Sequence, residues 1–195
     1  ASHASAGSAT APPAAVTEWA AAWSTLRPIG ILGGMGSFST MLYYQHVNRI
    51  IGERTGSRPQ SPSLIWSADL DACIAWESIG AWGLMGDHIA SGAMALERAG
   101  ASCLLIACNT VHHGESFDIV QSAVSIPVLH IADCTAGAVA GAGVKKVGLL
   151  GTRNTTDEEE SIYIGRLRER GVEVVVNDLA SRLAMVRPLL PPPPP

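Results

Sequence analysis

Short, continuously apolar runs alternate along the chain with longer segments whose apolar residues have helical spacing. Runs of the first kind are typical of strands buried on both faces of a parallel sheet. They predict strands over residues 29–33, 63–70, 102–108, 126–131, 145–152 and 172–178. Helices are predicted over residues 40–56, 74–101, 111–124, 133–143 and 155–171. Strands that alternate with helices indicate an α/β fold, a parallel-sheet three-layer sandwich.

The same pattern predicts one complete α/β domain over residues 28–143 and a partial second domain over residues 144–187. An internal repeat supports this division, because IGILGGMGSFST begins at residue 29 and VGLLGTRNTTDE begins 118 residues later, at 147. Each segment has an apolar strand, a glycine, a polar loop and a helix start. The repeat places the counterpart of segment 102–108 beyond residue 195, so we expect a truncated second domain.

The two ends of the chain lie outside this alternation. Residues 1–27 form an Ala/Ser/Pro-rich arm, in which residues 17–26 are expected to form a short helix that carries Trp19 and Trp23. Residues 188–195 are expected to form a polyproline tail. The arm begins without Met, and three interpretations stay open: a processed organellar precursor, an interaction arm and a cloning remnant.

Composition removes several classes of partner and site. The formal net charge is −4 and the basic residues form no stripe, which argues against nucleic acid. No apolar run reaches the roughly 18 residues of a transmembrane helix. The four cysteines form no CxxC pair and favour a reduced compartment, either the cytoplasm or an organelle. Without a His/Cys cluster of ligand spacing, no metal is expected.

Small polar residues follow three of the predicted strands, at the edge where parallel α/β sheets bind ligands. The three tips are residues 33–35, 108–110 and 151–155, and each precedes a predicted helix. Free backbone N–H groups at a helix start favour a carboxylate or a phosphate. The glycine loop matches neither GxGxxG nor GxxxxGK[ST], so a nucleotide is unsupported.

Cys108 is the candidate with the most specific chemistry, because it ends an apolar strand directly before a predicted helix. A thiol at a helix start has a lowered pKa and is available as a base or nucleophile. Asn109 and Thr110 would supply hydrogen-bond donors beside it. The alternative is that Cys108 is a small buried core residue. His112 and His113 are either proton partners or caps of the next helix.

The other cysteines are weaker candidates. We expect Cys103 to lie in the core and Cys73 to be structural, whereas Cys134 opens a helix after a strand and is a second, weaker candidate.

Taken together and in order, five segments between Pro28 and Arg187 resemble the aspartate/glutamate racemase family of cofactor-independent amino-acid racemases. They are IGILGGMGSFST, LIWSADLDACIAWESIGAW, IACNTVHH, IPVLHIADCTAGAV and VGLLGTRNTTDEEESIYIGRLRERGVEVVVND.

The resemblance implies two similar α/β domains that face each other across a cleft and bind an acidic amino acid. Two cysteines, one from each domain, flank the α-carbon; one thiolate takes the α-proton and the other thiol returns a proton from the opposite face. Neither pyridoxal phosphate nor a metal is implied. Cys108 matches the first catalytic cysteine. The residues that match the substrate site are Met35, Ser67, Asn109, Thr110, Thr152 and Thr155.

The sequence departs from the family in two places. Ser37 stands where a proline often follows the glycine loop, and nothing in the 195 residues corresponds to the GCTE-like segment that carries the second cysteine. One thiol can exchange a proton on one face but cannot deliver it to the other. Whether the chain is an enzyme is therefore left open by the sequence.

There are three hypotheses for the function. The first is an amino-acid racemase or epimerase that acts at the α-carbon through a cysteine thiolate. The second is a degenerate, inactive homologue that serves as an accessory subunit of a larger assembly, for instance an organellar one. The third is an amino-acid-binding module. The expected ligand is a small acidic amino acid or a dicarboxylate, and the expected protein partner is either a second copy or an assembly that contacts the terminal arms.

Overall fold

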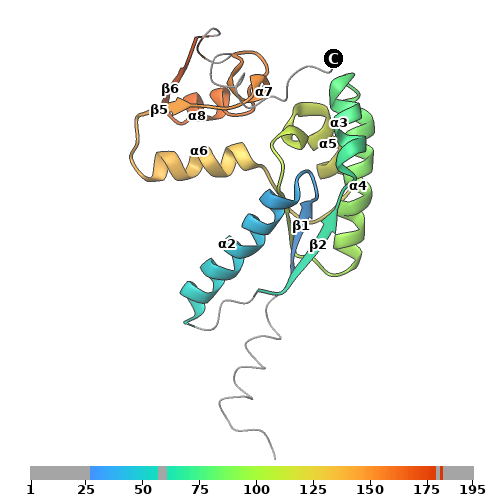
Figure 1. The fold of residues 1–195 in the computed structure, drawn as a ribbon. Coiled ribbons are helices and arrows are strands. Elements are labelled where there is room, and N and C mark those ends of the chain that lie inside the picture. The colour runs from blue at the N-terminus through green and yellow to red at the C-terminus, as the bar shows by residue number, and fades with distance from the viewer. Residues whose placement is uncertain (1–26, 57–60, 179–180, 182–195) are drawn as a thin grey trace, which may run out of the picture.

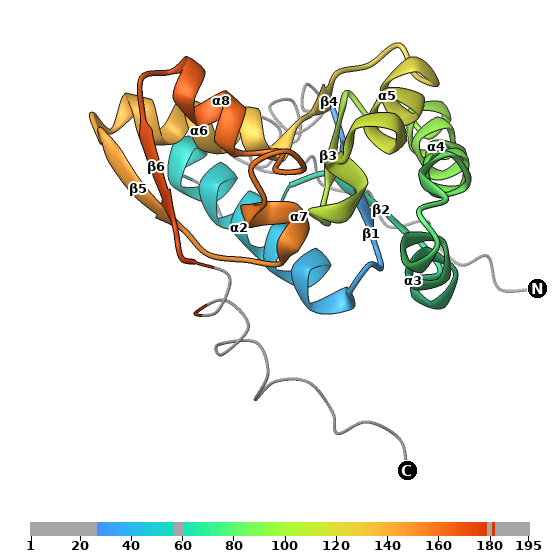
Figure 2. The ribbon, with the colours of Figure 1, turned by 90° about the horizontal axis from the view of Figure 1, so that it is seen from above.

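The computed structural model describes residues 27–56, 61–178 and 181. Four parallel strands form its first sheet, in the spatial order β2-β1-β3-β4 (Figures 1 and 2). They are β1 (Ile29–Gly33), β2 (Ser63–Ser67), β3 (Cys103–Ile106) and β4 (Val128–Leu129). The predicted N-terminal helix and the polyproline tail lie outside the described residues.

Helices cover both faces of this sheet, as Figure 2 shows from above. Helix α2 (Ser37–Thr55) packs on β1 from one side, and α4 (Trp82–Arg98) packs on β1 and β2 from the other. Helix α3 (Leu70–Ser78) and helix α5 (Gly114–Ser122) both pack against α4. The α/β fold with a parallel sheet, predicted from the alternating pattern, is therefore confirmed.

The first hydrophobic core lies between the sheet and α4. Leu32 and Leu104 from the sheet and Ile89 from α4 are fully buried there. Gly86 and Gly92 of α4 lie where this helix contacts α5 and Trp66 of β2. A Cβ atom on Gly92 would come within 2.3 Å of the Trp66 ring, and one on Gly86 would come within 3.1 Å of the Ser116 backbone. These glycines therefore allow a closer approach than any side chain would permit.

A second, smaller lobe contains the parallel strands β5 (Lys146–Leu149) and β6 (Glu173–Val176). Helices α6 (Ile131–Gly141) and α8 (Ile164–Glu169) cover it, and the short α7 (Arg153–Thr156) follows β5. Ala132, Ala136 and Leu167 form its core with Val147 and Val174. Helix α6 thus packs in this second lobe, although it precedes the domain boundary at 143/144 that the sequence predicts.

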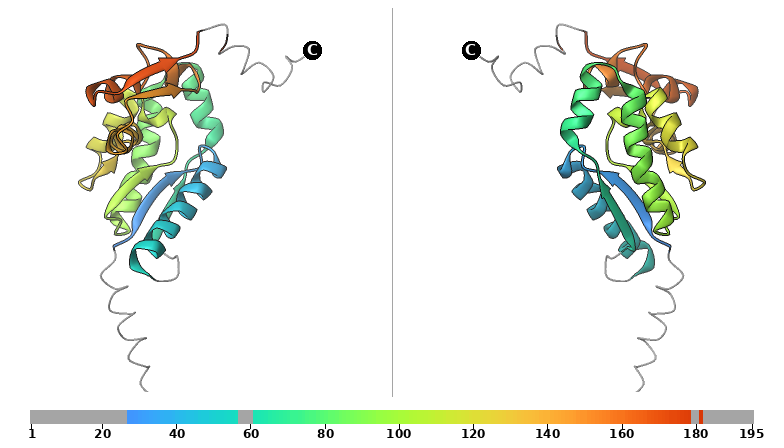
Figure 3. Two further views of the ribbon diagram at one scale, coloured as in Figure 1. Left: turned by 90° about the vertical axis from the view of Figure 1, so that its left-hand side faces the viewer. Right: turned by 90° about the vertical axis from the view of Figure 1, so that its right-hand side faces the viewer.

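The second lobe, which comprises α6 to β6, lies beyond the carboxyl ends of the first sheet's strands (Figures 1 and 3). The first lobe comprises β1 to β4 with α2 to α5. Because ligands bind at the carboxyl edge of a parallel sheet, this arrangement places the second lobe opposite the expected site. None of the described helices is both long enough and apolar enough to cross a lipid bilayer.

Three predicted helices are interrupted in the structure. The segment 74–101 divides at Gly80, whose φ of +69° belongs to the left-handed region that glycine adopts readily. The segment 111–124 divides into the 3-10 helix η1 (Thr110–His112) and α5. The segment 155–171 divides at a turn in which the Ser161 hydroxyl donates to the Thr155 carbonyl at 2.5 Å.

Candidate functional site

The first sheet brings three of the predicted residues to one edge. Gly33 at the end of β1 pairs with Ser67 of β2, and the Ala107 N–H donates to the Leu32 carbonyl at 2.8 Å. Met35, Ser67 and Cys108 therefore follow or end three adjacent strands. Met35 is half-buried against the first core, whereas Ser67 is exposed.

The glycine loop after β1 is held tightly at this edge. The Thr40 hydroxyl accepts a hydrogen bond from the Gly34 N–H at 3.0 Å and donates to the Gly36 carbonyl at 3.2 Å. Gly34 has a φ of +89°, and a Cβ there would come within 2.6 Å of the Ala68 backbone. The preceding glycine has a counterpart in the second lobe: a Cβ on Gly33 would come within 2.4 Å of the Thr40 side chain, and a Cβ on Gly151, which follows β5, would come within 2.6 Å of the Thr155 side chain. This similarity supports the internal repeat.

A pocket lies where the two lobes meet. The first lobe contributes three of its lining residues and the second lobe contributes the other three: Asn109, Thr110 and His113, then Thr152, Thr155 and Ile162. About 250 Å³ of space in and at the mouth of this pocket is free of protein atoms. That space includes open solvent, and the volume inside it that the centre of a water molecule can occupy is only about 10 Å³, room for about one water molecule. In this structure the pocket is therefore a narrow gap between the two lobes.

A hydrogen bond joins the lobes beside this pocket. The Tyr163 hydroxyl donates to Asn109 Oδ1 at 2.6 Å. Tyr163 is only 8% exposed, and burial raises the pKa of its phenol, with a further rise from the neighbouring Tyr43. The phenol is therefore neutral at pH 7 and keeps the proton that it donates.

Cys108 is half-buried and packs against the first core. Burial raises the pKa of its thiol, and the hydrogen bonds from the Val111 and Thr110 N–H groups and the Thr110 side chain oppose this rise only in part. The expected lowering of this pKa is thus wrong in direction. The helix start does supply its N–H groups, but η1 is only three residues long, and burial outweighs it.

His112 holds the backbone at Cys108. Its Nδ1 lies 2.7 Å from the Cys108 carbonyl oxygen, which can only accept, so Nδ1 carries the proton. Burial lowers the pKa of His112 to about 4, and the ring is therefore neutral at pH 7. It stacks on Phe117 and meets the His130 ring edge to face.

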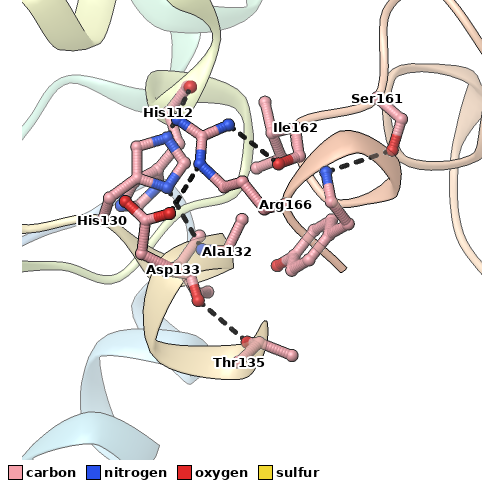
Figure 4. Close-up of polar contacts among 10 residues, drawn as sticks. His112, His130, Ala132, Asp133, Thr135, Ser161, Ile162 and Arg166 are labelled. Carbon is pink, nitrogen blue, oxygen red and sulfur yellow. Dashed lines mark hydrogen bonds and ion pairs between the residues drawn. The ribbon is translucent and has the colours of Figure 1, made fainter. Parts of the chain in front are cut away.

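His130 continues this chain of contacts into the second lobe (Figure 4). Its Nδ1 accepts from the Ala132 N–H at 3.2 Å, so its Nε2 donates to the His112 carbonyl at 3.3 Å. Next to it, Arg166 donates to Asp133 at 2.8 Å and to the Ile162 carbonyl at 3.0 Å. The β3 tip, α6 and α8 are thereby connected by polar contacts.

A match over most of the chain establishes the family. The sequence profile of the Asp/Glu/hydantoin racemase family matches residues 32–188. The chain belongs to this family. Its predicted resemblance to the aspartate/glutamate racemases is confirmed.

Two solved structures and one characterised protein illustrate the relationship. The chain is 32% identical to a putative Asp/Glu racemase from Yersinia pestis, over 84% of this chain and 70% of that one, with a TM-score of 0.75. It is 34% identical to PH1733, an aspartate racemase homologue from Pyrococcus horikoshii OT3, over 83% and 69%, with a TM-score of 0.68.

The broad specificity amino-acid racemase RacX of Bacillus subtilis is 34% identical over 90 residues. That match covers 46% of this chain and 37% of RacX, so the chain aligns with little more than a third of that relative.

In this racemase-family chain, four of the predicted site residues meet in one pocket: Asn109, Thr110, Thr152 and Thr155. Cys108 adjoins the pocket through Asn109, but Cys108, Met35 and Ser67 are not among its lining residues. The roles of all seven stay predictions.

Ile162 and Tyr163 were not among the residues predicted for the site. His113 was predicted to be either a proton partner of Cys108 or a cap of the next helix. His113 lines the pocket and stacks on Trp82 with ring centroids 4.7 Å apart. A signal for Tyr163 was present, because it is the last aromatic residue of the sequence and the only one after Phe117.

The remaining cysteines of the racemase-family chain differ in their surroundings. Cys73 is buried, and burial raises the pKa of its thiol to about 11, with a further rise from Cys108. Cys103 is half-buried in β3, and Cys134 is exposed on α6. Burial is the largest cause that raises the pKa of the Tyr43 phenol, and the nearby Cys134 and Cys108 raise it further. Both thiols therefore lie near this phenol.

Proposed function

We propose that the chain binds a small acidic amino acid in the pocket between its lobes and that Cys108 removes the proton from its α-carbon. The observation that carries this proposal is the composition of the pocket wall. Residues with amide and hydroxyl groups, from two strand tips in different lobes, line one narrow space between the lobes. The lobes would move apart for an amino acid to enter it. Membership of the racemase family gives this arrangement its chemical context.

The pocket wall suits a carboxylate. None of its six lining residues is acidic, and Asn109, Thr110, Thr152 and Thr155 all carry a group that can donate a hydrogen bond. Thr155 is 8% exposed, and its hydroxyl lies 3.4 Å from that of Thr152. Hydrogen bonds to an ionised group are stronger than those between neutral groups, so a bound carboxylate would gain from these donors.

Cys108 is suited to proton exchange on one face of the substrate. Its thiolate would take the α-proton to give a planar carbanion and a thiol, and return of a solvent-derived proton from that thiol would restore the amino acid. Inversion needs a second acid on the opposite face. Among the described residues of the second lobe, Cys134 is the one cysteine, and it is exposed on α6 and does not line the pocket. We therefore propose α-proton exchange as the step that this chain's own residues support, and racemisation as the activity of the family.

Solvent deuterium wash-in at the α-carbon tests this proposal. Each enantiomer of aspartate and glutamate is incubated with the protein in D₂O, and loss of the α-proton signal is followed by NMR. The wild-type protein is expected to exchange at least one of them. Cys108→Ala abolishes the exchange, whereas Cys103→Ala, a half-buried cysteine in the same strand segment, retains it.

Two outcomes would contradict the proposed role of Cys108. If the wild type exchanges none of the four amino acids, or if Cys108→Ala exchanges as fast as the wild type, Cys108 is not the base.

An amino-acid-binding module is a second candidate, favoured by one observation. Burial raises the pKa of the Cys108 thiol, which keeps it mostly protonated at pH 7. Calorimetric binding of succinate or aspartate without α-proton exchange would support this candidate. An accessory role in a larger assembly stays a prediction of the sequence.

A further inference from the structure

We infer that Tyr163 is a positioning residue, whose hydroxyl fixes the side-chain amide of Asn109 so that its NH₂ group donates into the pocket. This inference rests on the proposed function, since it names a residue that prepares the pocket for a carboxylate. Tyr163 itself is not among the lining residues of the pocket. It acts through Asn109.

The hydrogen bond between the two side chains has a direction. The Tyr163 hydroxyl donates to Asn109 Oδ1 at 2.6 Å. An asparagine amide presents an acceptor on one side and two donors on the other, and a half-turn about its last bond exchanges them. A donor held against Oδ1 favours one of these two orientations. It leaves Nδ2, which makes no hydrogen bond within the described residues, to face other partners.

The phenol is well placed to impose this orientation because the second lobe holds it firmly. Tyr163 is 8% exposed and packs in the second core with Ala132 and Leu167. Its N–H donates to the Ser161 hydroxyl at 3.2 Å, and that hydroxyl donates to the Thr155 carbonyl at 2.5 Å. The residue that orients Asn109 is thus tied to Thr155, which lines the other wall of the pocket.

The orientation matters because the expected ligand is an anion. With Nδ2 toward the pocket, the amide donates to a carboxylate oxygen. With Oδ1 toward the pocket, the amide oxygen opposes the carboxylate. Without the Tyr163 hydroxyl both orientations are populated, and substrate binding must select one of them.

A double-mutant cycle of Tyr163→Phe and Asn109→Ala tests the inference, with KM and kcat for α-deuterium exchange measured for each protein. Tyr163→Phe removes only the hydroxyl and keeps the buried ring. We expect it to raise KM about three- to ten-fold, the effect of one lost hydrogen bond, and to leave kcat unchanged. Asn109→Ala raises KM at least as much, and adding Tyr163→Phe to Asn109→Ala changes nothing more.

A second variant gives a readout that does not depend on altering Tyr163. Asn109→Asp keeps an oxygen that accepts from the Tyr163 hydroxyl but replaces the NH₂ donor with a charged acceptor. It is expected to raise KM more than Asn109→Ala does. Thermal melting of every variant shows whether it is folded.

Three results would overturn the inference. In the first, Tyr163→Phe leaves KM unchanged. In the second, it raises KM equally in the wild-type and Asn109→Ala backgrounds, which indicates a general packing effect. In the third, Asn109→Asp binds as tightly as the wild type. Failure of the proposed function is distinguishable from all three, because the wild type would then show no exchange or Cys108→Ala would exchange as fast as the wild type. If the wild type shows no exchange, the inference falls with the proposed function.

Discussion

Burial sets the protonation of the side chains around the β3 tip. It raises the pKa of the Cys108 thiol and lowers the pKa of the His112 and His130 rings, so all three groups are held in their neutral forms. Neutral His112 holds the Cys108 carbonyl through its Nδ1 proton. Contacts between uncharged groups therefore fix the geometry of this strand tip. Cys108 can act as a base only when its thiol ionises.

The rate of α-proton exchange is expected to rise with pH. Because the pKa of Cys108 lies above its ordinary value, only a small thiolate fraction exists at pH 7, and this fraction grows about tenfold for each pH unit below the pKa. Exchange rates of aspartate measured between pH 6 and 8 check this expectation. A rate that is flat over this range would show that the thiol is already ionised at neutral pH.

His112 predicts an acid-sensitive fold. Its pKa is lowered from 6.5 to about 4, so between these values the unfolded chain binds more protons than the folded one. The contribution of His112 to stability is therefore complete above pH 6.5 and is lost as the pH falls toward 4. We expect a loss of about 3 kcal/mol in the free energy of unfolding across this window.

Urea unfolding at about pH 7 and at about pH 4.5 measures this loss. His46→Gln, at an exposed site on α2, is the control and should keep the pH dependence of the wild type, whereas His112→Gln should reduce it. Equal pH dependence in the wild type and in His112→Gln would contradict the assignment.

The sequence predicted which residues end the strands but not their electrostatics. Cys108, Asn109 and Thr110 follow an apolar run, and this local signal placed them at the edge of the sheet. The direction of the Cys108 pKa shift depends on how deeply neighbouring elements bury the thiol. That depth is set by tertiary packing, which no local pattern contains.

At the scale of the elements, glycines of the predicted helix 74–101 have roles that the sequence pattern did not predict. Gly80 separates α3 from α4 through its left-handed backbone. Gly86 and Gly92 lie inside α4, where helix propensity alone disfavours them, because α5 and the Trp66 ring approach too closely for a side chain. The contacts that select these glycines come from segments distant in sequence, so the local pattern contained no sign of them.

Alanine substitutions at two helical glycines are expected to have opposite effects. Gly92→Ala places a methyl group within 2.3 Å of Trp66 and should destabilise the protein by about 1–3 kcal/mol. Gly137→Ala on α6 has open space around the new methyl group and should stabilise by up to about 1 kcal/mol. Chemical denaturation of the two variants measures both changes. Similar effects of the same sign would contradict the packing described for α4.

At the scale of the whole molecule, the candidate site belongs to neither lobe alone. Asn109 and Thr110 come from the first lobe, and Thr152 and Thr155 come from the second. The internal repeat and the family resemblance predicted that both strand tips contribute. They did not predict the Tyr163 contact or the packing of α6 in the second lobe, because both depend on how the lobes are placed against each other.

A ligand bound between the lobes is expected to protect both of them. Hydrogen exchange followed by mass spectrometry, with and without saturating aspartate, should show slower amide exchange in residues 107–113 and in residues 150–156. Protection confined to one of these segments would mean that the ligand contacts a single lobe, and the account of a shared pocket would be wrong.

The central claim is that the Cys108 sulfur reaches the α-hydrogen of an acidic amino acid. NMR detection of deuterium at the α-carbon of aspartate or glutamate, in D₂O with purified protein, measures this most directly. The account predicts incorporation by the wild type and by Cys103→Ala, and none by folded Cys108→Ala. Incorporation that persists undiminished without the Cys108 thiol would contradict it.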